Sequence, residues 1–174
     1  MQDELEEIFR RIAERYDQPI KIGSQCEANT FYHIEDLTVG ELEQASHYLA
    51  GRVEEVCYPD SPTMVIHLSS CITDLPDLIA ERIGPPAQPV EVVNANKLGQ
   101  GNGITRRLKS ARVIVANDVI TTAKSCLELH ARLTMMGAHV VAWVALVDRT
   151  FGPGPVPVIA AHTGEPVRLL QSLS

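Results

Sequence analysis

The chain has 174 residues, of which 45% are hydrophobic and 21% charged, a composition typical of a folded globular domain. Its formal net charge is -7, from 22 acidic and 15 basic residues, which argues against a nucleic-acid partner because binding phosphates along a backbone needs clustered Lys and Arg. No window reaches the ~18 apolar residues of a membrane span, and the start "MQDELEEIFRR" lacks the apolar core of a signal peptide. We therefore expect a cytoplasmic protein with no membrane partner.

The four cysteines do not suggest a metal centre. They form no CxxC pair, and no histidine lies at zinc-finger spacing from them. We therefore expect reduced thiols and no directly bound metal. Cys126 follows a predicted helix start, where a thiol pKa can fall, but a buried and inert cysteine is the simpler interpretation.

Residues 1–60 are predicted to form helices and a small hood. Apolar residues recur at helical spacing over 3–16, which predicts an N-terminal helix. The segment "NTFYHIEDL" alternates in polarity and predicts a short strand. Thr38, with Glu41 three residues later, is typical of a helix start, so a helix is expected through "VGELEQASHYLAGRV".

Residues 61–150 are predicted to form the core of the same single domain, and 151–174 a C-terminal segment with "FGPGPVP" as an irregular connector. Apolar runs predict strands at 63–68, 89–94, 111–117, 138–147 and 156–161. Helices are expected at 74–84 and 125–136, and a polar, glycine-rich loop at 96–110. Core side chains are expected at His67, Met135, Met136 and Trp143. Strands alternating with helices indicate a mostly parallel sheet, whose ligands bind beyond the carboxyl ends of the strands.

The stretch "NDVITTAKS", residues 117–125, joins the third predicted strand to the next helix. The first N–H groups of a helix are unpaired and, with the positive end of its dipole, form an anion site. Three hydroxyls and one cation would face that site: Thr121, Thr122, Ser125 and Lys124. Asn117 and Asp118 offer acceptors just upstream, so a ribose 5-phosphate matches the arrangement. An ordinary strand-to-helix turn capped by Ser125 is the alternative.

The segment "VIVANDVITTAKS" resembles the signature of type I phosphoribosyltransferases: an apolar strand, two acidic residues, three variable positions and Thr-Gly-x-Ser/Thr. "DVITT" is most similar to the orotate enzymes of that family. The resemblance covers roughly residues 63–150 and, more weakly, the N-terminal helix and "GSQCEANTFYHIEDL". It implies a single-domain α/β fold with a mostly parallel central sheet, flanking helices and a small N-terminal hood.

The resemblance also implies a role for each loop. In this family the loop after the third strand holds the 5-phosphate of PRPP (5-phosphoribosyl 1-diphosphate), so 121–125 would bind phosphate and Asp118 a ribose hydroxyl. "NKLGQGNG" resembles a degenerate form of the family's catalytic loop, in which Lys97 would neutralise the leaving diphosphate. The diphosphate loop would be "SSCIT", with Ser69, Ser70 and Cys71. Arg149 follows the fourth strand, where the family often places groups that recognise the base.

Several residues depart from the family pattern. Asn117 stands where the first acid is usual, and Ala123 and Lys124 replace glycines. Leu98 stands where the orotate enzymes have histidine, and "SSCIT" lacks the usual glycine. These departures make binding of the phosphate and ribose a firmer expectation than chemistry.

We therefore expect a phosphoribosyltransferase that moves phosphoribose from PRPP to a pyrimidine-like base such as orotate and releases diphosphate. Mg²⁺ would be carried by PRPP, and the assembly would be a homodimer. The alternative is a catalytically degenerate protein on the same scaffold that binds or senses PRPP or a nucleoside 5′-monophosphate. A redox dinucleotide binder is disfavoured because no GxGxxG follows the first predicted strand of the sheet.

Overall fold

The computed structural model describes residues 2–22, 26–84, 89–100, 103–150 and 154–170 of the chain. Gly101 and Asn102 of the predicted glycine-rich loop, and residues 151–153 of the predicted connector, lie outside the described residues. Within the part of the chain that is described, no helix is both long and apolar enough to cross a bilayer.

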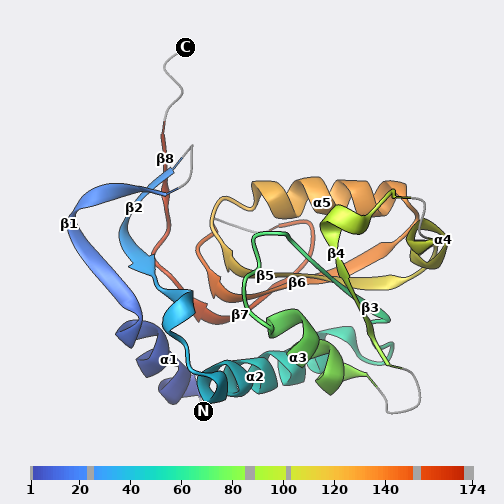
Figure 1. The fold of residues 1–174 in the computed structure, drawn as a ribbon, viewed down its shortest axis with the longest axis horizontal. Coiled ribbons are helices and arrows are strands. Elements are labelled where there is room, and N and C mark those ends of the chain that lie inside the picture. Colours follow the sequence, from blue (N-terminus) through green and yellow to red (C-terminus); the bar gives the residue numbers. More distant parts are fainter. Residues whose placement is uncertain (1, 23–25, 85–88, 101–102, 151–153, 171–174) are drawn as a thin grey trace.

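The described residues form a five-stranded parallel sheet in the order β4-β3-β5-β6-β7 (Figure 1). The strands are β3 (Met64–His67), β4 (Glu91–Asn94), β5 (Arg112–Ile120), β6 (His139–Asp148) and β7 (Val158–Thr163). The central strands are almost continuously apolar because helices cover both faces of the sheet. The prediction of a mostly parallel sheet is therefore confirmed.

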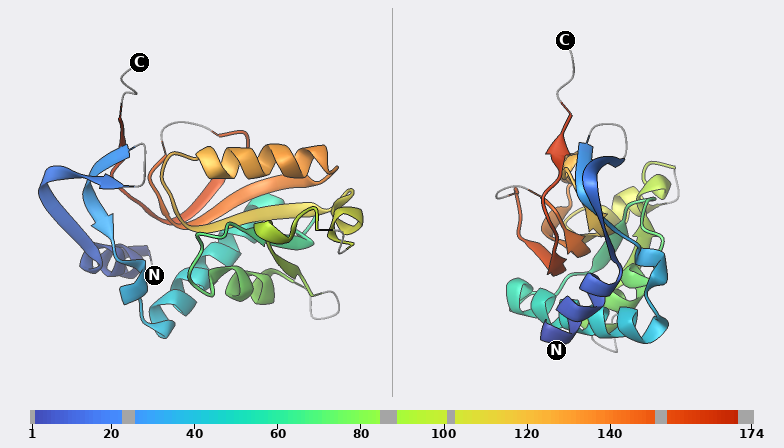
Figure 2. Two further views of the ribbon diagram at one scale, coloured as in Figure 1. Left: turned by 45° about the horizontal axis from the view of Figure 1, so that its top comes forward. Right: turned by 90° about the vertical axis from the view of Figure 1, so that its left-hand side faces the viewer.

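Helices α2 (Val39–Cys57) and α3 (Leu75–Ile83) pack on one face of the sheet, and α5 (Lys124–Met135) covers the other (Figure 2). α2 begins at the predicted capping box, in which Thr38 Oγ1 accepts from the backbone N–H of Glu41 and the Glu41 carboxylate accepts from the backbone N–H of Thr38. Trp143 is fully buried under α5, as predicted. The prediction that Met135 lies in the core is wrong: it ends α5 and is 89% exposed.

The N-terminal hood contains more strand than the sequence suggested. Helix α1 (Gln2–Arg11) ends early, and β1 (Ala13–Ile22), β2 (Cys26–Tyr32) and β8 (Arg168–Leu169) form a second, antiparallel sheet in the order β1-β2-β8. The expected helix through residue 16 is therefore wrong, because 13–15 pair with β2 instead. Figure 1 shows this sheet beyond the end of the central sheet at which the arrows of β6 and β7 finish.

Two further differences affect the ligand edge. β5 continues to Ile120, so Asn117 and Asp118 lie inside the strand rather than after it. The segment predicted as a loop over 96–110 contains a 3₁₀ turn at Ala95–Lys97 and a short helix, α4 (Ile104–Leu108). Leu98 is 3% exposed and packs in the core beneath α5, so its apolar side chain is explained by burial.

Candidate functional site

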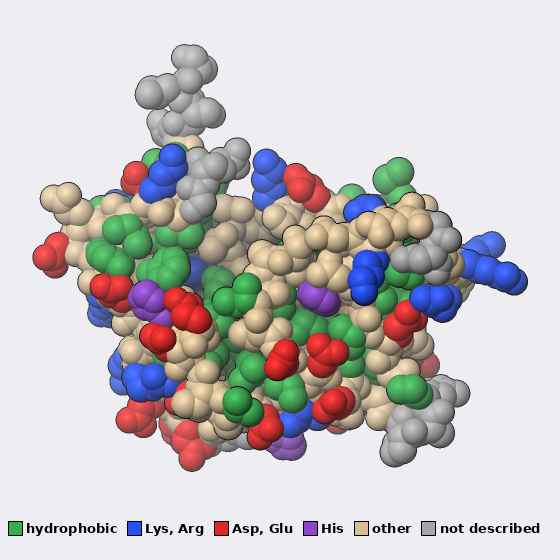
Figure 3. All heavy atoms as spheres, in the orientation of Figure 1, with side chains coloured by type: hydrophobic (Ala, Val, Ile, Leu, Met, Phe, Trp, Pro, Cys, Tyr) green, Lys and Arg blue, Asp and Glu red, His purple; other side chains and the backbone are tan. Residues whose placement is uncertain are grey.

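The loops after β3, β5 and β6 leave the carboxyl edge of the sheet side by side and face the hood. Together they enclose a cavity of about 370 Å³, here called the main pocket. Its walls on the sheet side are Ser70, Ile72, Asn117, Asp118, Val119, Thr121, Ser125 and Arg149. Its walls on the hood side are Ile22, Phe31, Tyr32, Ile34 and Glu35. Figure 3 shows hydrophobic side chains at the surface of the hood and of the adjoining loops.

Asp118 is 4% exposed, and its carboxylate holds the loop that follows β3. Oδ2 accepts from the backbone N–H groups of Ile72 (2.6 Å) and Thr73 (3.3 Å), and Oδ1 accepts from the Thr73 hydroxyl (2.5 Å). The Cys71 thiol adds a longer contact at 3.4 Å. Asp118 therefore shapes the wall of the main pocket before any ligand is bound, and its predicted contact with a ribose hydroxyl stays a prediction.

Asn117 uses both ends of its amide, which gives a reason for an amide where an acid was expected. Its Nδ2 donates to the backbone carbonyl of Val119 (2.9 Å), and its Oδ1 accepts from the Ser70 hydroxyl (3.1 Å). A carboxylate could not donate to that carbonyl and would place a second negative charge beside Asp118. Asn117 is 8% exposed, so its hydrogen bonds are shielded from water.

A second, smaller cavity of about 40 Å³ lies where β5 turns into α5. It is formed by Leu68, Asn117, Val119, Ile120, Thr121, Thr122, Ala123, Lys124, Ser125 and Cys126. We call it the β5–α5 cradle. Four of its residues, Asn117, Val119, Thr121 and Ser125, also line the main pocket. The five predicted phosphate-binding residues are therefore gathered around one small space that adjoins a larger one.

Ala123 sits at the N-cap of α5 in the left-handed backbone region, with φ 59° and no side-chain cap bond. The helix thus starts without Ser125 as its cap, contrary to the alternative interpretation of this turn. A left-handed conformation costs an L-residue about 1–2 kcal/mol, whereas glycine adopts it freely. This explains why a glycine is usual here and why the smallest chiral residue replaces it.

Substitution of Ala123 by valine should therefore lower the free energy of unfolding by about 1–3 kcal/mol, because a β-branched side chain is strained at positive φ. Ala123→Gly should leave stability unchanged or slightly raised, since the relieved strain is offset by the entropy of glycine in the unfolded chain. Denaturant unfolding of both variants checks this. Equal stability of the valine variant and the unaltered protein would show that the turn is not strained.

Arg149 is 2% exposed and bridges β6, the hood and the C-terminal segment. Its Nη1 donates to the carbonyl of Thr30 (2.9 Å) and its Nε to the carbonyl of Glu165 (2.8 Å). Its Cζ lies 5.5 Å from the ring centroid of Tyr32. The buried Nη2 has no hydrogen-bond partner among the described residues. Burial lowers the pKa of the guanidinium, which still stays cationic at neutral pH, so the pocket wall carries a positive charge with an unused donor.

The remaining predicted residues are placed unevenly. Ser70 lines the main pocket, whereas Ser69 is exposed and lines neither cavity. Cys71 contacts Asp118, and burial raises the pKa of its thiol. Burial raises the pKa of Cys126 to about 12, so that thiol is inert at neutral pH, as expected. Lys97 is exposed in the 3₁₀ turn after β4 and lines neither cavity of its own chain.

The hood residues of the main pocket were missed by the sequence analysis. Phe31, Tyr32 and Ile34 come from a segment that carried only the weak part of the resemblance. Phe31 and Tyr32 lie in β2, and Ile34 lies in the turn that follows it. Their apolar character was the available signal, because aromatic side chains on a small hood have few places to be buried other than against a ligand or the sheet edge.

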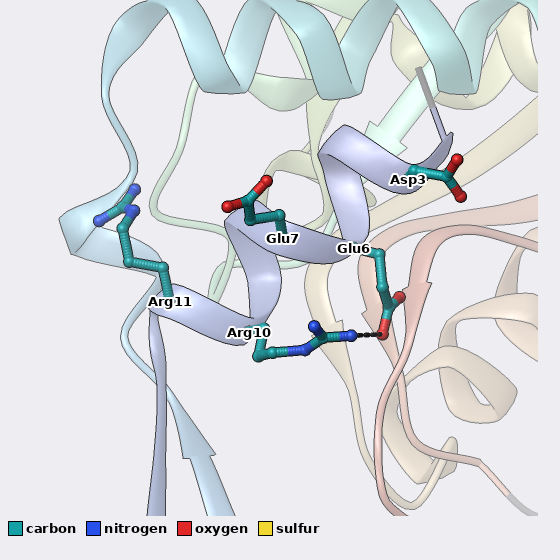
Figure 4. Close-up of a pocket in the computed structure, with 5 residues that line it drawn as sticks. All are labelled: Asp3, Glu6, Glu7, Arg10 and Arg11. Carbon is teal, nitrogen blue, oxygen red and sulfur yellow. Dashed lines mark ion pairs between the residues drawn. The ribbon is translucent and has the colours of Figure 1, made fainter.

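A broad depression of about 630 Å³ lies over α1, away from the loops that carry the predicted residues. Figure 4 shows its lining, Asp3, Glu6, Glu7, Arg10 and Arg11, with an ion pair between Arg10 and Glu6. These are exposed side chains of one amphipathic helix and converge on no common point. The main pocket, which draws on five separate segments, is therefore the better candidate site.

Comparisons with known proteins agree with this placement. No family profile matches the sequence, and no curated protein matches it significantly. Among solved structures, however, the chain has the fold of the type I phosphoribosyltransferases, which confirms the predicted fold class and resemblance.

Three of these structures illustrate the match. Orotate phosphoribosyltransferase from Mycobacterium tuberculosis, solved with Fe(III) dicitrate, is 20% identical with a TM-score of 0.63, over 93% of this chain and 95% of that one. Adenine phosphoribosyltransferase from Trypanosoma brucei, solved with AMP, pyrophosphate and ribose-5-phosphate, is 16% identical with a TM-score of 0.64, over 91% and 79%. A Neisseria gonorrhoeae protein solved with ppGpp is 10% identical with a TM-score of 0.56, over 74% and 82%.

Proposed function

We propose that the chain binds PRPP or a nucleoside 5′-monophosphate and transfers phosphoribose to a pyrimidine-like base such as orotate. The observation that carries the proposal is the junction of the β5–α5 cradle with the main pocket. The 5-phosphate would lie in the cradle, against the start of α5, Lys124 and the hydroxyls. The ribose would lie beside Asn117 and Asp118, where the two cavities share residues.

The base would occupy the end of the main pocket between the hood and Arg149. Phe31 and Tyr32 provide an apolar wall suited to a flat ring. The unpartnered Nη2 of Arg149 would donate to a carbonyl or carboxylate of the base. A charged donor to a carboxylate gives one of the stronger hydrogen bonds found in proteins, which favours a base that carries such a group.

In the proposed reaction a ring nitrogen of the base gives its proton to water and forms a bond to C1 of the ribose, while the bond from C1 to the diphosphate oxygen breaks. The diphosphate leaves with that electron pair. The protein would act by holding the two reactants in line and by supplying charge. Mg²⁺ would arrive on PRPP and neutralise the leaving diphosphate. Substrate oxygens and water would hold the ion.

The proposal includes a cytoplasmic homodimer, because the basic side chains suited to a diphosphate lie away from the main pocket of their own chain. Lys97 lies between β4 and α4, and the exposed Arg106 lies within α4. Figure 3 shows Lys and Arg side chains gathered near α4. A second copy could present them at this pocket. Sedimentation analysis would decide, and a monomer at assay concentrations would remove the dimer from the proposal.

Lys97→Ala tests its catalytic role. A lysine that acts on the departing diphosphate stabilises the transition state more than the bound substrate, so the variant should lower kcat and kcat/KM together and spare KM. Losing one such charged donor typically costs about 100-fold in rate. Steady-state kinetics of diphosphate release measures this, with Lys109→Ala as a control of equal charge change. Unaltered turnover would exclude Lys97 from the chemistry.

A second candidate function is binding or sensing without turnover. It is favoured by the engagement of Asp118 with the loop after β3 and by the distance of Lys97 from the cavities. The neighbour solved with ppGpp belongs to the same fold. In this case the main pocket and cradle would bind a nucleotide as a signal.

One experiment separates the two functions. The protein is incubated with PRPP, Mg²⁺ and a panel of bases that includes orotate, uracil and adenine, and diphosphate release is measured. Release that depends on one base supports the transferase and names its substrate. Saturable binding of PRPP or a nucleotide with no release for any base supports the sensor.

A further inference from the structure

A chain of three side chains from distant parts of the sequence ends at the wall of the main pocket. Glu6 on α1 contacts His162 on β7, with 2.8 Å between Oε2 and Nδ1. His162 in turn contacts Tyr32 on β2, with 3.1 Å between Nε2 and the phenol oxygen. Figure 4 shows Glu6 projecting from α1, where its other oxygen pairs with Arg10. The chain links the outside of α1 to the hood side of the pocket.

The hydrogen-bond pattern assigns the tautomer of the neutral His162 ring. A carboxylate only accepts, so Nδ1 must carry the proton that faces Glu6. In the neutral ring Nε2 is then an acceptor and receives the phenol proton of Tyr32. Burial raises the pKa of Tyr32, which keeps the phenol protonated and able to donate at neutral pH. Glu6 thus selects the tautomer that holds Tyr32.

Packing leaves the Tyr32–His162 pair little freedom. The His162 ring stacks on Phe9, with centroids 5.3 Å apart and planes 10° from parallel. Tyr32 itself is 7% exposed. A Cβ added at Gly164 would lie 3.0 Å from the Tyr32 phenol oxygen and 3.0 Å from Cγ of Arg149. Tyr32 is therefore held between His162 on one side and Arg149 on the other.

We propose that His162 is a positioning residue, which holds the Tyr32 ring beneath Arg149 and thereby fixes the base-binding end of the main pocket. This inference rests on the proposed function, since it assumes that the base lies against Tyr32 and Arg149. It gives β7 and α1 a part in base selection, although neither element lines the pocket. The phosphate end, at the β5–α5 cradle, should not depend on His162.

Two ligands and three variants test the inference. The ligands are ribose 5-phosphate, which reports on the cradle, and orotidine 5′-monophosphate, which adds a base. His162→Phe keeps the stack on Phe9 but removes both hydrogen bonds, whereas His162→Gln retains a polar atom near the position of Nε2. Tyr32→Phe removes the same hydrogen bond from the other side. Affinities for both ligands are measured by calorimetry.

His162→Phe should keep the affinity for ribose 5-phosphate within about two-fold of that of the unaltered protein. It should lower the affinity for orotidine 5′-monophosphate by about five-fold, the equivalent of one net hydrogen bond. His162→Gln should recover most of that loss, and adding Tyr32→Phe to His162→Phe should cause no further loss. An unchanged ratio of the two affinities, or losses that simply add, would overturn the inference alone. Failure of ribose 5-phosphate to bind the unaltered protein would overturn the proposed function and this inference with it.

Discussion

Replacing Arg149 with methionine should lower the free energy of unfolding by about 2–4 kcal/mol, because the buried carbonyl of Thr30 and the part-buried carbonyl of Glu165 would lose their donor. The hood would lose its main polar link to β6. The same change should lower the affinity for a base-bearing nucleotide by about ten-fold or more, since a hydrogen bond to a charged group contributes about 1.5–3 kcal/mol. Affinity for ribose 5-phosphate should change much less.

Denaturant unfolding and calorimetry measure the two effects separately. Arg149→Lys is the informative second variant: one ammonium cannot reproduce the planar fork that reaches two carbonyls and the pocket, so it should rescue little. Arg52→Met, on the exposed face of α2 and away from both cavities, is the matched control and should change neither quantity. If Arg149→Met bound the nucleotide as tightly as the unaltered protein, the base would have to lie elsewhere.

Asp118→Asn should lower the free energy of unfolding by about 1.5–3 kcal/mol even without ligand, because one amide end would face donors that now meet a carboxylate. For a chain of this size that is a fall in Tm of roughly 3–12 °C. The shape of the side chain is preserved, so a cavity is not the cause. PRPP or nucleotide binding should weaken as well, through a loosened loop after β3 and through any direct contact with a ribose hydroxyl.

Thermal unfolding of the ligand-free variant distinguishes these causes. Asp74→Asn is the matched control. Asp74 is exposed, and its side chain makes no capping hydrogen bond at the start of α3, so the Tm of this variant should equal that of the unaltered protein. A ligand-free Asp118→Asn protein as stable as the unaltered one, but with weakened ligand binding, would mean that Asp118 acts on the ligand alone.

The central sheet was predictable from the sequence because both of its faces are buried. Burial on both faces forces the central parts of β3, β5 and β6 to be apolar, and such runs bounded by turns stand out. β1 gave no comparable signal. Most of its side chains are exposed, so hydrogen bonding to β2 rather than burial defines it. The helical spacing of apolar residues therefore predicted a helix to residue 16, whereas α1 ends at Arg11.

The cradle was predictable for a related reason: apart from Leu68, its residues all lie within 117–126, so one stretch of sequence shows almost the whole cluster. The partners of Asp118 and Arg149 were not. Asp118 meets a loop 45 residues away, and Arg149 meets Thr30 across 119 residues. Such contacts leave no periodic trace in a single sequence. The contact between Tyr32 and His162, which are 130 residues apart, could not be predicted from the sequence for the same reason.

The most direct test of the central claim is whether the protein is stabilised by a phosphate on the sugar. A ligand that binds only the folded state adds about 2.7 kcal/mol at 100 times its Kd, and each kcal/mol moves Tm by roughly 2–4 °C. A saturating pyrimidine nucleoside 5′-monophosphate should therefore raise Tm by about 5–10 °C, and the unphosphorylated nucleoside should do far less.

Lys124→Glu places a like charge beside the phosphate and should remove most of that difference. Lys109→Glu makes the same charge change beside Gly137, at the other end of α5, and should leave it intact. We expect a phosphate-dependent rise in Tm that is lost in Lys124→Glu and kept in Lys109→Glu. Equal shifts for nucleoside and nucleotide, or no shift from either at millimolar concentration, would contradict it.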